Sequence, residues 1–103
     1  MARLTLNPAP TFKATVDICR PGLDTEKIEI TFKHRTRDQM DEFIKQMEGM
    51  SIEDQVMAVA SGWDLVDQFS LENVQLLAQN YITAPMAIRD KYISELIKAK
   101  EKN

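Results

Sequence analysis

Apolar and polar residues alternate along two stretches near the start of the chain. Every second side chain is apolar in residues 11–18, and the alternation returns in residues 26–35. A period of two is typical of a half-buried β-strand, because successive side chains point to opposite faces. Pro21 and Gly22 lie between the stretches and favour a turn. The pattern predicts an antiparallel hairpin with a connection of about five to seven residues.

Beyond residue 35 the apolar residues recur at helical spacing. The first such group is Met40, Phe43, Ile44 and Met47. Hydroxyl side chains that can cap a helix precede four stretches of this kind: Thr36, Ser51, Ser70 and Thr83. Gln39 is placed to form a capping box with Thr36, and Pro85 suits the first turn of the last stretch. These signals predict about four helices.

Glycines predict where the first two helices end. Gly49 is expected to end the first in the left-handed conformation, and Gly62 to end the second. The apolar stripe of the second helix would then include Ala60 and Trp63. Trp63 itself is expected at or just past the last turn of that helix.

Strands followed by helices, rather than alternating with them, indicate an α+β fold. The expected architecture is an N-terminal antiparallel β-hairpin followed by about four α-helices. With 103 residues the chain has the length of one domain. Two prolines within residues 7–10 predict a flexible N-terminal arm over residues 1–10. Residues 11–103 are then a single α+β domain.

The stretch from Gly62 to Ser70 contains the one tryptophan and has no clear period. Loops between rigid helices often carry contacts, and aromatic residues dominate binding energy at interfaces. The candidate partner-binding residues are therefore Trp63, Asp64, Asp67 and Phe69. Two other interpretations stay open: the tryptophan could fill the core, and the two carboxylates could be solvated or cap local backbone N–H groups.

Charge is distributed unevenly around a net charge of −3. Residues 46–88 contain six acidic side chains and neither Lys nor Arg. Such a segment does not suit nucleic acid, whose phosphates need basic contacts, but it suits a basic protein partner. An alternative is that the acids lie at helix N-termini. The basic cluster in residues 33–37 is interpreted as charges that protect an edge strand.

The sequence offers little chemistry for a reaction. It has one histidine and one cysteine, and its three glycines do not form a phosphate-binding loop. We expect no catalytic residues, no cofactor and no metal site. Cys19 is interpreted as a small packing residue. Some methionines are candidates for an apolar docking patch: Met50, Met57 and Met86.

The chain shows no sign of export or membrane insertion. The first ten residues contain no apolar run of the length that a signal peptide needs. No window reaches the ~18 apolar residues of a membrane span. A single cysteine gives no indication of an oxidising compartment. A cytoplasmic location is therefore expected.

From Phe12 to Asn103 the chain resembles the tail assembly chaperones of long-tailed bacteriophages. The residues that carry the resemblance are Phe32-Lys33, Asp41-Glu42-Phe43, the segments 59–64 and 69–74, Tyr81, Ala87-Ile88, Tyr92, Leu96 and Lys102-Asn103. Each piece is generic, and their order along a chain of this length carries the likeness.

This resemblance implies a non-catalytic role in assembly. Such a chaperone binds the long, aggregation-prone tape measure protein, and the tail tube protein is a second expected partner. It would act in the host bacterial cytoplasm and be absent from the mature virion. Nucleic acid and membrane are not expected partners. The alternative is another non-enzymatic adaptor or a minor phage structural protein.

Overall fold

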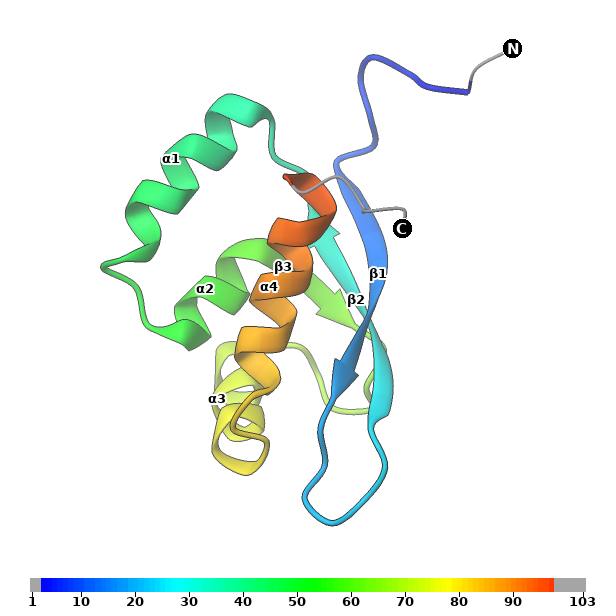
Figure 1. Ribbon diagram of the computed structural model, residues 1–103, viewed down its shortest axis with the longest axis vertical. Helices are drawn as coiled ribbons and strands as arrows, with labels where there is room; N and C mark the ends of the chain where they lie inside the picture. The colour runs from blue at the N-terminus through cyan, green and yellow to red at the C-terminus, as the bar shows by residue number, and fades with distance from the viewer. Residues whose placement is uncertain (1–2, 98–103) are drawn as a thin grey trace, which may run out of the picture.

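The computed structural model describes residues 3–97, which form a three-stranded sheet and four helices (Figure 1). In chain order the elements are β1 (Thr11–Ile18), β2 (Glu26–Lys33), α1 (Arg37–Met47), α2 (Ile52–Val59), β3 (Ala60–Trp63), α3 (Leu71–Asn80) and α4 (Ala84–Leu96). The fold is α+β, and the predicted hairpin and four helices are confirmed.

The hairpin pairs β1 with β2 along their whole lengths, from Thr11 opposite Lys33 to Ile18 opposite Glu26. In the connection, the N–H of Leu23 donates to the carbonyl of Arg20 at 3.0 Å. Gly22 occupies the third position of this turn with φ at 73°, a left-handed conformation that favours glycine. The turn predicted from Pro21 and Gly22 is confirmed.

The expected extent of the second helix is wrong. α2 ends at Val59, and Ala60–Trp63 forms β3, antiparallel to β2 with a register shift between Thr31 and Phe32. Ser61 and Gly62 are weak helix formers, and pairing with the open edge of β2 overrides the helical spacing. The sheet order is therefore β1-β2-β3, and β2 is the central strand.

The predicted helix starts are confirmed in part. Thr36 and Gln39 form the capping box. The hydroxyl of Ser51 accepts the backbone N–H of Asp54, and the hydroxyl of Ser70 accepts that of Asn73. Thr83 precedes α4, but its side chain makes no capping hydrogen bond.

Three expectations about single residues are also wrong. Gly49 is not left-handed, since Gly22 is the one described residue with positive φ. Met40 and Phe43 of α1 are buried, whereas Ile44, expected on the same stripe, is exposed. Cys19, expected to pack, is exposed as well.

All four helices lie on one face of the sheet (Figure 1). The alternation of the strands explains this, because the apolar residues of β1 and β2 share that face. The buried core joins both layers and includes Val16, Ile18, Ile28, Ile30, Phe32, Val56, Val59, Val74, Ile88 and Tyr92. Helix α4 packs against β1, α2 and α3, so it closes the core.

Tyr92 of α4 connects the two layers. Its ring is fully buried, with the ring centroids of Phe32 and Phe43 at 5.4 and 6.3 Å. Its hydroxyl donates to the carbonyl of Lys33 at 2.8 Å and accepts from Nη1 of Arg35 at 3.0 Å. The Arg35 guanidinium lies 4.3 Å from the centre of the Phe43 ring, within cation–π range. A single hydroxyl thus joins α4 to the end of β2.

The basic cluster after β2 has a structural role that differs from the expected one. Nη2 of Arg35 donates to the carbonyl of Ala58 at 3.0 Å, and Nζ of Lys33 donates to that of Met57 at 3.3 Å. These carbonyls belong to the last turn of α2, which has no basic residue of its own. Because β2 is central, protection of an edge strand cannot be the reason for these charges.

Replacing Tyr92 with Phe should lower the free energy of unfolding by about 1–3 kcal/mol. The substitution keeps the ring but leaves the Lys33 carbonyl and one Arg35 donor without their buried partner. Urea unfolding measures the change. Tyr81→Phe is the control, because Tyr81 is only half-buried. Equal stability of the two variants would contradict this role for the hydroxyl.

Burial raises the pKa of the Tyr92 hydroxyl above its usual value. The unfolded chain then releases this proton at about pH 10, while the folded chain still holds it. The free energy of unfolding should therefore fall as the pH rises above about 10. Urea titrations across this range should show a smaller fall for Tyr92→Phe than for Tyr81→Phe. Identical slopes would exclude Tyr92 as the source.

Candidate functional site

Asp64 closes the sheet where the chain leaves β3. Its N–H donates to the carbonyl of Glu29 at 3.1 Å, and its Oδ1 accepts the N–H of Glu29 at 3.0 Å. The side-chain oxygen thus takes the place of the backbone carbonyl that a longer strand would offer. Asp64 is exposed, but its carboxylate already has this structural contact.

Trp63 and Phe69 hold the two ends of the loop together. Their rings meet edge to face, with centroids 5.1 Å apart and planes at 89°, and both residues are half-buried against the core. Nε1 of Trp63 donates to the carbonyl of Asp67 at 2.7 Å. Further along, Nδ2 of Asn73 donates to the carbonyl of Gln68 at 2.6 Å. Side chains therefore fix an irregular backbone.

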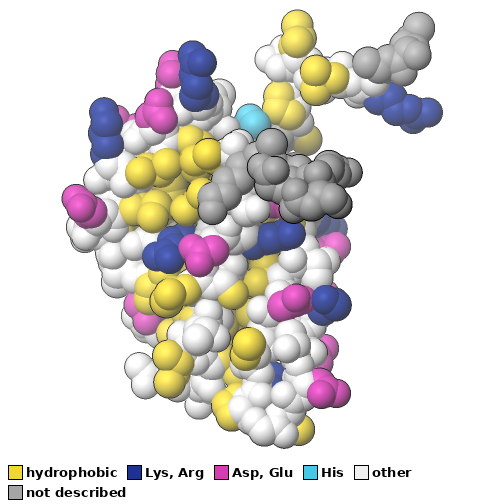
Figure 2. Space-filling view, in the orientation of Figure 1, with side chains coloured by type: hydrophobic (Ala, Val, Ile, Leu, Met, Phe, Trp, Pro, Cys, Tyr) yellow, Lys and Arg dark blue, Asp and Glu magenta, His cyan; other side chains and the backbone are white. Residues whose placement is uncertain are grey.

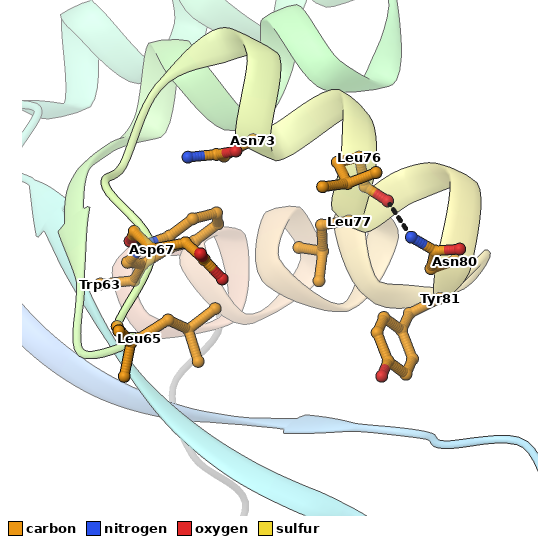
Figure 3. A pocket seen from close by; sticks show the side chains of 9 residues that line it. Trp63, Leu65, Asp67, Asn73, Leu76, Leu77, Asn80 and Tyr81 are labelled. Carbon is orange, nitrogen blue, oxygen red and sulfur yellow. Dashed lines mark hydrogen bonds between the residues drawn. The ribbon is translucent and has the colours of Figure 1, made fainter.

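A hollow of about 430 Å³ separates this loop from α3 (Figure 3). We call it the α3 groove, and it is lined by Trp63, Leu65, Val66, Asp67, Asn73, Leu76, Leu77, Asn80 and Tyr81. Figure 3 shows Trp63, Leu65 and Asp67 on the loop side of the open space, facing the side chains of α3. Most of the lining is apolar, as in many ligand and peptide sites.

Two apolar side chains on the groove are open to solvent. Val66 at the loop tip is fully exposed, and Leu76 of α3 is 57% exposed. A smaller hollow of about 260 Å³ shares Asn80 and Tyr81 with the groove, and is also lined by Arg20 and by Ile82, which is exposed. Figure 2 shows hydrophobic side chains at the surface of the helical layer. Clustered exposed apolar residues of this kind are typical of interaction surfaces.

The groove carries a negative charge. Asp67 is its one charged lining residue, among side chains that the structure describes. Asp64 and Glu72 lie in the same loop and in the first turn of α3. Glu53, Asp54 and Glu72 stand in first turns, as the helix-dipole alternative predicted, but Asp67 does not.

The structure places two of the four candidate residues on the α3 groove. Trp63 and Asp67 line the α3 groove, whereas Phe69 packs against Trp63 and Asp64 bonds to β2. Whether any of them binds a partner stays a prediction.

Sequence reasoning missed the part of the groove that α3 supplies. The available signal was Leu76, which lies next to Leu77 and widens the apolar face of that helix beyond a single stripe. Met50 and Met57, suggested for a docking patch, pack against the core instead. Met86 is exposed but does not line the groove.

Within residues 3–97, no group of three or more His, Cys, Asp or Glu side chains could hold a metal ion. Over the same residues, no helix has the length and apolar character needed to cross a membrane.

Fold and surface together define a small α+β domain with a mostly apolar surface groove that is lined by one carboxylate, that of Asp67. Residues 1–103 match the family model described as phage tail assembly chaperone, and the chain belongs to this family. No curated protein and no solved structure matches the chain.

Asp64→Ala should destabilise the fold by about 1 kcal/mol, because it leaves the N–H of Glu29 without its acceptor. Asp64→Asn is the matched variant, since an amide oxygen can accept the same hydrogen bond without a negative charge. Urea unfolding should place the Asn variant close to the unmodified protein. If both variants unfold alike, the hydrogen bond is not what stabilises the loop.

Proposed function

We propose that this phage tail assembly chaperone binds the tape measure protein, keeps it soluble and promotes assembly of the tail tube around it. The proposed site of action is the host bacterial cytoplasm. Membership of the family supports the general role in tail assembly. The observation that supports a direct contact with an aggregation-prone partner is the exposed apolar lining of the α3 groove.

Apolar surface is what a chaperone needs in order to shield a partner from aggregation. Burial of apolar area contributes roughly 25 cal/mol per Å², whatever the partner's sequence. The side chains of Val66 and Leu76 already stand in solvent, so covering them does not require the chain to rearrange. This surface favours apolar segments of the tape measure protein.

Charge would select among apolar segments. No lysine or arginine occurs in residues 46–88, and Asp67 lines the groove. A segment that carries Lys or Arg beside its apolar residues would therefore be attracted, whereas an acidic segment would be repelled. The proposed occupant is an apolar segment of the tape measure protein with flanking basic residues.

The proposed role is non-catalytic. Nucleophilic or acid–base catalysis needs a reactive group beside an orienting partner. The groove presents Asp67 with two asparagines, and neither histidine nor cysteine stands among its lining residues. Its apolar walls suit binding.

The variant Val66→Lys/Leu76→Lys should lose at least about tenfold in affinity for the tape measure protein, or about 1.4 kcal/mol. It replaces the two exposed apolar residues of the groove with positively charged ones and leaves the buried core residues unchanged. The measurement is the soluble fraction of the tape measure protein on co-expression, followed by titration of the purified pair. The control is Ile44→Lys, because Ile44 is 41% exposed on α1, outside the groove.

Two results would contradict the proposal at different levels. If the tape measure protein is equally insoluble with and without the unmodified chain, the chaperone role proposed here is wrong. If it is solubilised equally by the groove variant, the role stands but the α3 groove is not the contact. Mass spectrometry of purified virions should find no copy of this chain, and its presence would favour a structural component.

A further inference from the structure

Among residues 3–97, the sheet has one long edge along which no further strand pairs. β3, at one side, has four residues and runs directly into the loop at Asp64. β1, at the other side, has eight residues, with neither glycine nor proline within it. An edge of this kind is a template for pairing with another strand.

The hydrogen bonds of the hairpin show which backbone groups of β1 face outward. The N–H of His34 donates to the carbonyl of Pro10 at 2.8 Å, so these opposed residues form a bonded pair. Bonded and non-bonded pairs alternate in an antiparallel ladder. The backbone N–H and C=O groups of the even-numbered residues of β1 therefore face β2. The N–H and C=O groups that face the open edge belong to Thr11, Lys13, Thr15 and Asp17.

A contact on the other side of the sheet supports this assignment. The N–H of Asp64 donates to the carbonyl of Glu29, so an odd-numbered residue of β2 bonds toward β3. The even-numbered residues of β2 are then the ones that bond toward β1, as the contact at His34 requires.

We propose that β1 pairs in antiparallel fashion with β1 of a second copy of this chain, around a two-fold axis at Thr15. The two sheets would join into one of six strands across the axis. In this register Thr15 pairs with the partner subunit's Thr15, and Lys13 with the partner subunit's Asp17. All of these residues have outward-facing backbone groups, so each pair exchanges two hydrogen bonds.

Charge complementarity selects this register. The side chains of Lys13 and Asp17 are 65% and 59% exposed on the face away from the helices. Nζ of Lys27 lies 2.9 Å from Asp17, so Asp17 would stand between Lys27 and the partner's Lys13. A two-fold axis at Lys13 or at Asp17 would place that residue opposite its own copy and so oppose like charges. An axis at Ala14 or at Val16 would leave neither Lys13 opposite the partner's Asp17 nor Asp17 opposite the partner's Lys13. The axis at Thr15 therefore opposes unlike charges twice.

The apolar face supports the same pairing. Phe12 and Ala14 are only half-buried, although Val16 and Ile18 of the same strand are buried. The two-fold axis at Thr15 places Phe12 beside the partner's Ile18 and Ala14 beside the partner's Val16. These are non-hydrogen-bonded positions, where opposed side chains come closest. The open side of the core would thus be covered by the second copy.

Amide hydrogen exchange and sedimentation of the full chain test the pairing directly. At high concentration the protein should sediment as a dimer, and the amides of Lys13, Thr15 and Asp17 should exchange slowly. On dilution these amides should become unprotected, while Ala14 and Val16 stay protected by the hairpin. A protein that remains monomeric up to about 1 mM, the weak end of specific association, would overturn the proposal.

Variants separate this register from other modes of association. Thr15→Pro removes an N–H that the hairpin does not use, and should give a monomer with an unchanged circular dichroism spectrum. Lys13→Asp and Asp17→Lys should each weaken the dimer about tenfold, and the double variant should recover most of that loss.

Arg37→Asp is the control for net charge, because Arg37 is 91% exposed at the start of α1. It should leave the dimer unchanged. A dimer that survives Thr15→Pro, or a double variant that is weaker than both single ones, would overturn the proposed register. Binding of the tape measure protein is measured separately, through the α3 groove.

Discussion

The buried hydroxyl of Tyr92 is the contact on which the arrangement of the two layers depends. It bonds to the end of β2 and to Arg35, and Arg35 in turn reaches the last turn of α2 and the ring of Phe43 in α1. Four elements are therefore tied together at one point. A buried polar network of this kind is stabilising only when each member has its partner, which fixes the direction in which α4 crosses the sheet.

Local signals predicted most of the fold, because their causes lie within a few residues. The capping box of Thr36 and Gln39 and the turn at Gly22 each depend on contacts between near neighbours. β3 could not be found in this way. Ala60 and Trp63 fit the spacing of a helix, and what makes them a strand is the open edge of β2, about thirty residues earlier in the chain. Without β3, β2 would be an edge strand, and for this reason the charges of Lys33 and Arg35 were wrongly expected to protect an edge.

The candidate loop shows how far residue type can predict a role. The residue types of Trp63 and Asp67 make them candidates for binding, and both line the α3 groove. Asp64 carries the same functional group as Asp67, yet it completes a sheet ladder with Glu29. The difference is positional, because only Asp64 follows directly on β3. Leu76, in contrast, was overlooked because one extra leucine in a helix has many ordinary explanations.

Three side-chain contacts within the β3–α3 loop bear on how a partner could be released. Because the tryptophan, Phe69 and Asn73 already hold the backbone, the loop loses little conformational entropy on binding. The entropic cost of complex formation then falls mainly on the bound segment, which must become ordered. A protein whose binding site is already ordered can release a flexible bound segment without unfolding any part of itself. In the complex proposed above, the rate of release would then depend mainly on the bound segment of the tape measure protein.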